Sequence, residues 1–192
     1  MEQLEESIGY TFKDKNLLKN ALTHTSYAYE HHVDSNEKLE FLGDSILEFL
    51  SSKYIYSHYP HLKEGEMTKV RAEVVCEDSL YIVAQKHHFS DFLYLGKSED
   101  VADSVEAVIA AIYFDSGLEE AEKFIVTNLA EAVEASSKNV GMKDHKTVLQ
   151  EKLQEHGTVH INYEVIKTSG PDHDKSFTVE VYCDGKALAI GE

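Results

Sequence analysis

The sequence predicts a mainly α-helical fold, in which an all-helical unit over residues 1–136 precedes a smaller α+β unit over residues 144–192. Apolar residues recur at helical spacing through the first unit. Residues 137–143 are mostly polar and include a glycine, which is typical of a linker. After this linker, apolar and polar residues alternate, as expected for strands with one buried face.

The longest predicted helix runs from about Ser35 to His58. Ser35 or Asn36 is a suitable N-terminal cap, and Pro60 follows the expected end of the helix. The apolar residues cover more than one face, so we expect this helix to lie at the centre of a bundle. Other helices are expected at about 15–22, 66–75, 77–88, 101–115 and 118–136.

The second unit is predicted to have the order α-β-β-β. Asp184-Gly185 is a typical tight-turn pair between its last two strands. Three strands and one helix leave a sheet face uncovered, so we expect that the last helix of this unit is lacking from the sequence. The predicted elements are a helix over 147–156 and strands over 161–167, 177–182 and 186–190.

The chain has 192 residues, 42% of them hydrophobic, which is enough for one or two domains with real cores. It has no apolar run of the roughly 18–20 residues that span a bilayer, and its acidic N-terminus lacks the features of a secretion signal. We therefore expect a cytoplasmic protein with no membrane partner. Cys76 and Cys183 are expected to be reduced core residues, not a disulfide or a metal site.

The net charge of −17, from 18 basic and 35 acidic residues, argues against a protein that binds phosphate through many cations. The simplest interpretation is an acidic surface that keeps the protein soluble. The alternative is that some of the acids bind metal and that the few cations have specific positions. Composition favours the first interpretation, so only a motif can support the second.

Acidic side chains occur in two strongly apolar segments. Glu37, Glu40 and Asp44 lie in the first, and Asp103 and Glu106 lie in the second. Spacings of three, four and seven residues place such groups on one face of a helix. Carboxylates crowded among apolar residues are costly unless a cation joins them, and Mg²⁺ prefers oxygen ligands. The two segments therefore predict a divalent-metal site.

Each acid also has a simpler interpretation as part of a solvated helix face. This interpretation is favoured for Asp103 and Glu106 taken alone, because paired acids are common on helices. It is weaker for Glu40 and Asp44, which have large apolar residues on both sides. Gly43 lies between them, and a glycine within a helix costs about 1 kcal/mol relative to alanine. This glycine suggests close approach by another backbone or a ligand.

The segment from Asn36 to Asp44, with its Glu-Lys-Leu-Glu-Phe-Leu-Gly-Asp run, closely resembles the signature of the ribonuclease III family. Residues 21–26 and 64–72 resemble its flanking elements, and residues 102–107 resemble its second acidic motif. Residues 144–192 resemble the start of a double-stranded-RNA-binding domain. The resemblance covers nearly the whole chain.

This resemblance implies an endonuclease domain that hydrolyses double-stranded RNA in RNA processing, leaving 5′-phosphate and 3′-hydroxyl ends. It implies Mg²⁺ as the cofactor, for which Mn²⁺ can substitute. The implied metal ligands are Glu40, Asp103 and Glu106, while Asp44 and Glu106 are the implied catalytic pair. Glu37 is a further catalytic candidate at the rim, and its alternative role is that of a first-turn acid favoured by the helix dipole.

The resemblance also implies partners. Phe41 is expected to insert into a pocket of a second subunit, giving a homodimer with one catalytic centre per RNA strand. The alternative for Phe41 is ordinary core packing. Gln150, Glu151 and His173 are the implied RNA contacts, and double-stranded RNA is read largely by its shape. His173 is otherwise a turn residue that hydrogen-bonds within its own loop.

Two cations in the first unit are candidates for phosphate contacts. Lys69 and Arg71 lie in a predicted helix, and pairing with nearby acids such as Glu66 and Glu73 is the alternative. The eleven histidines form no zinc motif, and no Gly-x-x-x-x-Gly-Lys loop is present. We therefore expect neither structural zinc nor a nucleotide cofactor.

Two other functions remain open. The first is a non-catalytic double-stranded-RNA-binding or ribosome-associated module with the same fold. The second, weaker alternative is an acidic helical protein that binds divalent ions and has no role with RNA. The complete acidic motifs favour the enzyme over both.

Overall fold

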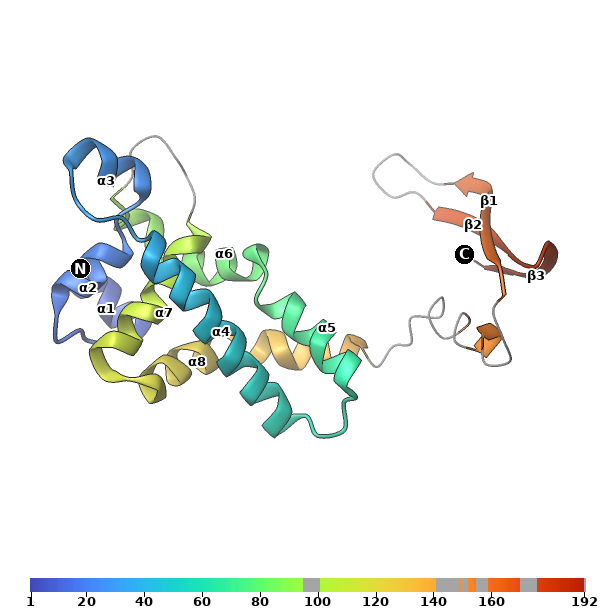
Figure 1. Ribbon diagram of the computed structural model, residues 1–192, viewed down its shortest axis with the longest axis horizontal. Helices are drawn as coiled ribbons and strands as arrows, with labels where there is room; N and C mark the ends of the chain where they lie inside the picture. Colours follow the sequence, from blue (N-terminus) through green and yellow to red (C-terminus); the bar gives the residue numbers. More distant parts are fainter. Residues whose placement is uncertain (95–100, 141–148, 150–151, 155–158, 170–175, 192) are drawn as a thin grey trace. The chain divides into compact units, whose positions relative to one another are not determined.

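The computed structural model describes residues 1–94, 101–140, 149, 152–154, 159–169 and 176–191. The chain divides into two compact units, Met1–Gly141 and Met142–Glu192. The first unit is helical and the second contains a three-stranded sheet (Figure 1). This confirms the predicted fold class.

The first unit is a bundle around one main core. Six of its helices were predicted to within a few residues, whereas α1 and α3, of seven residues each, were not. The helices are α1 (Glu2–Ile8), α2 (Lys15–Ala21), α3 (Thr25–His31), α4 (Glu37–His58), α5 (Glu64–Val74), α6 (Glu77–Lys86), α7 (Ala102–Ser116) and α8 (Leu118–Val140), with a 3₁₀ turn η1 at Phe89–Asp91.

The central helix is α7, which packs against α2, α4, α6 and α8 (Figure 1). Every residue from Ala107 to Ile112 is buried. Alanines in this run let neighbouring helices approach closely. The prediction that α4 is central is therefore wrong. One face of α4 is buried, but Phe41 and Phe49 on its other face are exposed.

Helix α8 continues to Val140, so residues 137–140 of the predicted linker are helical. Packing explains the difference, because Ser136 and Ser137 are buried. The Ser136 hydroxyl donates to a carboxylate oxygen of Glu73 at 2.5 Å, which ties α8 to α5. Composition alone favours a linker at Ser137, whose hydroxyl instead donates to the Glu134 carbonyl oxygen at 2.8 Å within the helix.

The C-terminal end of α7 is fixed by the loop between α1 and α2. The Asp115 carboxylate accepts hydrogen bonds from the Tyr10 hydroxyl at 2.6 Å and from the backbone N–H groups of Lys13 and Asp14 at 2.9 Å. Burial opposes ionisation of Asp115, but these hydrogen bonds lower its pKa overall. Burial and the bond to Asp115 raise the pKa of Tyr10 to about 12.

The second unit contains an antiparallel sheet in the order β1-β2-β3. Its strands are β1 (Ile161–Ser169), β2 (Ser176–Cys183) and β3 (Lys186–Gly191), which confirms the three predicted strands. Asp184 and Gly185 both have positive φ, at 48° and 80°, as a tight hairpin requires. The predicted helix over 147–156 lies mostly outside the described residues, of which Leu149 and residues 152–154 are helical.

The cysteines differ from expectation in one respect. Both are free thiols, but Cys76 is exposed and Cys183 is only partly buried, so the prediction of two core residues is wrong. Cys76 precedes α6, where its thiol donates to the Glu73 carbonyl oxygen at 3.0 Å. Its position at a helix start, outside the apolar face of α6, explains the exposure.

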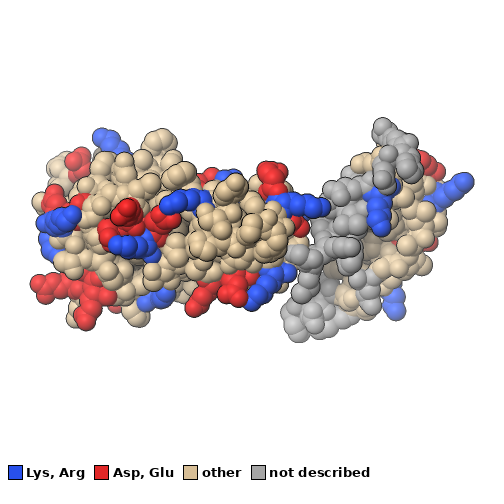
Figure 2. Space-filling model, turned by 90° about the horizontal axis from the view of Figure 1, so that it is seen from below, with Lys and Arg blue, Asp and Glu red and all other residues tan. Residues whose placement is uncertain are grey.

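The helical unit carries surface charges of both signs (Figure 2). Within the described part of the chain, no helix is both long and apolar enough to cross a membrane. On the face of the helical unit in Figure 2, acidic and basic side chains are interspersed, with other residues between them. The negative charge is therefore not gathered into one continuous acidic surface on that face.

Candidate active site

The site is built where α4 crosses α7. A Cβ atom placed on Gly43 would overlap the Glu106 carbonyl oxygen and lie 3.1 Å from the Glu106 Cα atom. Only glycine permits this approach of two backbones, which explains a glycine in the middle of α4. Glu40 and Asp44 flank Gly43 on α4, so the crossing brings the two acidic segments together.

The pKa of Glu106 reflects the proximity of the two acidic segments. Burial, together with the negative charges of Asp44, Glu40 and Asp103, raises the pKa of Glu106 to about 7. Glu106 is thus half-buried among three like charges. We name Glu40, Asp44, Asp103 and Glu106 the carboxylate cluster.

The members of the carboxylate cluster differ in exposure. Glu40, Asp103 and Glu106 are partly buried, whereas Asp44 is exposed. A simple solvated helix face does not account for Glu106, since its half-buried carboxylate faces acids from a second helix. Glu37 lies in the first turn of α4, where it is exposed and accepts a hydrogen bond from the Ser35 hydroxyl at 2.9 Å.

The donor set suits a hard divalent cation. All four side chains offer oxygen, and a cation would relieve the repulsion that Glu106 experiences. Among the described residues, no group of three or more His, Cys, Asp or Glu side chains is arranged so that it could hold a metal ion. Mg²⁺ commonly needs only one or two carboxylates, with waters and substrate phosphates as the other ligands. The cluster therefore fits this kind of ion and not a zinc cage.

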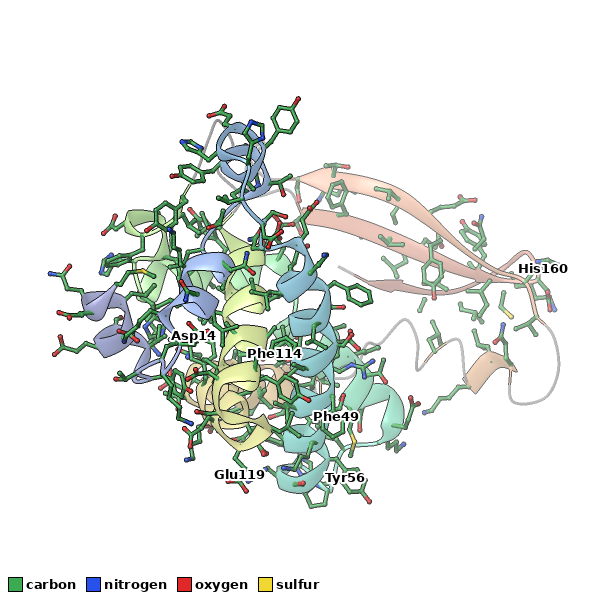
Figure 3. The ribbon with its side chains drawn as sticks, turned by 60° about the vertical axis from the view of Figure 1, so that its left-hand side comes forward. Asp14, Phe49, Tyr56, Phe114, Glu119 and His160 are labelled. Atoms are coloured by element: carbon green, nitrogen blue, oxygen red, sulfur yellow. The ribbon has the colours of Figure 1, made fainter. Side chains whose placement is uncertain are left out.

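Phe41 follows Glu40 on α4 and points away from the core. Its side chain is 79% exposed, so the alternative of ordinary core packing is wrong. Phe49 and Tyr56 are also exposed on α4, at 56% and 74%. Figure 3 shows Phe49 and Tyr56 one after the other along α4, beside α7.

Sequence reasoning missed a groove beside the cluster. A hollow of about 440 Å³ is lined by Asp44, Ser45, Glu48, Phe49, Ser52 and Arg71. Nη1 of Arg71 donates to the Ser52 hydroxyl at 3.0 Å and lies 3.7 Å from a carboxylate oxygen of Glu48. The four-residue spacing of positions 44, 48 and 52 along one helix was the available signal.

Arg71 does pair with an acid, as the alternative predicted, but that acid is Glu48 on α4 and not Glu66 or Glu73. Glu66 accepts a hydrogen bond from the Lys63 backbone N–H at 2.7 Å, closing the first turn of α5. Glu73 accepts from Ser136. Lys69, the other phosphate candidate, is exposed. The predicted RNA contacts Gln150, Glu151 and His173 lie outside the described residues.

Comparison with known proteins gives matches over both units. Residues 14–133 match the family model described as ribonuclease-III-like, and residues 145–192 match the double-stranded RNA binding motif. The chain is 42% identical to Ribonuclease 3 of Enterococcus faecalis, covering 99% of the chain and 88% of that relative. It is also 42% identical to Ribonuclease 3 of Caldanaerobacter subterraneus, covering 98% and 88%.

Solved structures give the same result. The nuclease domain of ribonuclease III from Campylobacter jejuni superposes with a TM-score of 0.61 at 35% identity, covering 67% of this chain and 98% of that one. Dicer from Pichia stipitis gives a TM-score of 0.55 at 27% identity, covering 93% and 84%. None of these matches favours a non-catalytic module. The chain belongs to the ribonuclease III family, and it is an endoribonuclease of double-stranded RNA with a nuclease unit followed by an RNA-binding unit.

Proposed function

We propose that the carboxylate cluster is the catalytic centre and that it works with Mg²⁺. Glu40, Asp103 and Glu106 are the proposed ligands, of which one or two would bind the ion directly and the others through its waters, and Mn²⁺ would substitute for Mg²⁺. The observation that carries this proposal is the crossing at Gly43, where acids from two helices meet around the half-buried Glu106. The products would carry 5′-phosphate and 3′-hydroxyl ends.

The acids have different tasks. When bound, a divalent ion would neutralise the phosphate and help activate water. Glu106, whose charged form is disfavoured without a cation, gains most from sharing its charge with one. Asp44 is the exposed member and also lines the groove, so its carboxylate would orient the attacking water or accept its proton. Glu37, one turn before Glu40 on α4, would act at the rim of the site.

We also propose that the protein works as a homodimer joined through Phe41. A phenyl ring that is 79% exposed next to Glu40 is costly in water and is suited to a partner's pocket. The solved nuclease-domain structure of the Campylobacter jejuni relative is described as showing structural flexibility in a region involved in dimer formation. A two-fold dimer would offer one catalytic centre to each strand of a duplex.

The second unit is proposed to hold the duplex for the nuclease unit. It matches the double-stranded RNA binding motif over residues 145–192, and such domains recognise duplex shape through phosphates and 2′-hydroxyls. Gln150, Glu151 and His173 remain the predicted contacts. The cytoplasmic location expected from the sequence also remains a prediction.

The test of the catalytic centre is Glu106→Gln, which removes one charge and keeps the shape of the side chain. With Mg²⁺, wild type should cut a long RNA duplex, and EDTA should stop the reaction. Glu106→Gln should lower kcat at least about 100-fold. Equal cleavage by wild type and Glu106→Gln would refute the proposed centre.

A binding measurement completes this test. In Ca²⁺, which replaces Mg²⁺ without supporting cleavage in many nucleases, Glu106→Gln should still retard the duplex in a gel. Loss of binding together with activity would mean that the substitution disrupts the fold or the RNA surface, and not the chemistry alone. Glu131→Gln, an exposed acid on α8, is the control for removing one negative charge.

A further inference from the structure

A groove runs along the exposed face of α4, starting beside the carboxylate cluster. The hollow that contains Asp44 is followed by a second hollow of about 190 Å³, which continues to Tyr56 and Glu64. The two hollows have Ser52 and Arg71 in common. Arg71 therefore lies at the junction of the hollow that contains Asp44 and the hollow that contains Tyr56. Figure 3 shows Phe49, which lines the first hollow, and Tyr56, which lines the second, one after the other along α4.

Arg71 is the single arginine in the sequence. Its side chain is 35% exposed. A guanidinium carries five N–H donors in a planar fork. In the described part of the chain, its polar contacts are the hydrogen bond to Ser52 and the 3.7 Å pair with Glu48. The guanidinium is held in place and retains donors for a ligand in the groove.

The spacing along α4 defines which phosphate Arg71 could reach. Asp44 and Ser52 are eight residues apart, which is about 12 Å along a helix axis. Arg71 bonds Ser52 and approaches Glu48, so its guanidinium lies about 6–12 Å beyond Asp44 along the helix axis, where it would face a different phosphate from the one at Asp44. It is well placed for a different phosphate on the same strand, where its charge would offset repulsion from the acids.

We propose that Arg71 binds a backbone phosphate flanking the cleaved bond, so that one RNA strand follows α4 from the carboxylate cluster toward Tyr56. This inference rests on the proposed catalytic centre. Phosphate replaces the long contact with Glu48, because a phosphate offers the fork two oxygens at close range. Ser52 keeps the guanidinium facing the groove.

The test is Arg71→Gln in the full chain. Duplex binding is measured in Ca²⁺ at several salt concentrations, and cleavage kinetics are measured in Mg²⁺. Loss of one phosphate contact should reduce the slope of log K against log salt by about one. KM should rise about tenfold with a smaller change in kcat, since the contact already exists in the bound substrate. Arg71→Lys should restore the slope but only part of KM.

Lys53→Gln is the matched control. It also removes one positive charge from α4, where Lys53 pairs with Glu122 at 2.6 Å, and Lys53 lines neither hollow. It should leave the salt slope and KM unchanged. A wild-type salt slope in Arg71→Gln, or a fall in kcat with normal KM, overturns the proposal and makes Arg71 a structural link between α4 and α5. Cleavage by Glu106→Gln would refute the catalytic centre instead, and the binding slope does not depend on that result.

Discussion

Folding strongly changes the environment of Glu106. Its pKa is about 7 in the folded protein because of burial and the charges of Asp44, Glu40 and Asp103. In the unfolded chain a glutamate has a pKa of about 4.3. Between these values the folded state binds more protons than the unfolded state. The free energy of unfolding of the metal-free protein should therefore fall as pH rises from about 4.3 to about 7.

The cost of ionising Glu106 in the folded protein predicts that Glu106→Gln stabilises the metal-free protein. In EDTA at pH 8, the free energy of unfolding should rise by about 1–2 kcal/mol, a value discounted for solvent screening of a partly exposed cluster. The gain should disappear at about pH 3, well below the unfolded pKa, where Glu106 is protonated in both states. Urea unfolding at the two pH values measures it. Glu131→Gln should show no such pH-dependent gain, and equal stability of wild type and Glu106→Gln at pH 8 would contradict the prediction.

At the scale of elements, the site depends on how closely α4 approaches α7. Gly43→Ala should force the helices apart, because the added methyl group would overlap the backbone of Glu106. We expect a loss of at least about 3 kcal/mol in the free energy of unfolding, since rigid backbone cannot yield as a side chain does. Activity should also fall, because the acids of α4 and α7 would separate.

Gly65→Ala is the control for this prediction. Gly65 is also helical, in the first turn of α5, and nothing lies within 4 Å of a Cβ atom built on it. Alanine there should raise the free energy of unfolding by about 0.5 kcal/mol, because it restricts the unfolded chain. Thermal unfolding distinguishes the two cases. Similar changes in Tm for both variants would contradict the role of Gly43 in helix approach.

The elements that the sequence predicts well are those with long periodic apolar patterns. Helices α4 and α7 fall into this group, and their acidic motifs are found together with them. Helices α1 and α3 have seven residues each and were missed, whereas α2, of the same length, was predicted from the helical spacing of Leu17, Leu18 and Leu22. Helices this short depend on tertiary contacts, so a weak apolar pattern does not identify them. In α1 the signal was the pair Leu4 and Ile8, one turn apart and both buried.

In the candidate active site, too, local sequence patterns predict some features, and others depend on tertiary packing. Motif spacing predicts which acids share a face, and Gly43 predicts a close approach without naming its partner. Arg71 on α5 contacts Glu48 and Ser52 on α4, and Ser52 is 19 residues away from it in the sequence. A local pattern favours neighbours such as Glu66, so only the packing of the two helices identifies the actual partners.

At the scale of the whole molecule, the two units divide the work. The helical unit holds the acids rigidly, because α7 is buried along most of its length and fixed at its end by Asp115. The second unit supplies duplex recognition, as its match to the RNA-binding motif indicates. A chain with a net charge of −17 can act on RNA if its cations are placed locally and its acids are used by metal. A second copy of the nuclease unit would then be needed to cut the second strand.

Phe41 tests this requirement. Phe41→Asp places a charge where an apolar contact between subunits is proposed, and burying it unpaired would cost several kcal/mol, about 3 or more. The variant should therefore be a monomer by light scattering at concentrations where wild type is a dimer, with the same helix content by circular dichroism. Tyr29→Asp is the control, because Tyr29 on α3 is similarly exposed, at 84% against 79% for Phe41. It should leave the dimer intact. A dimeric Phe41→Asp variant would mean that subunits meet elsewhere, and the exposed face of α4 would then be available to RNA along its whole length.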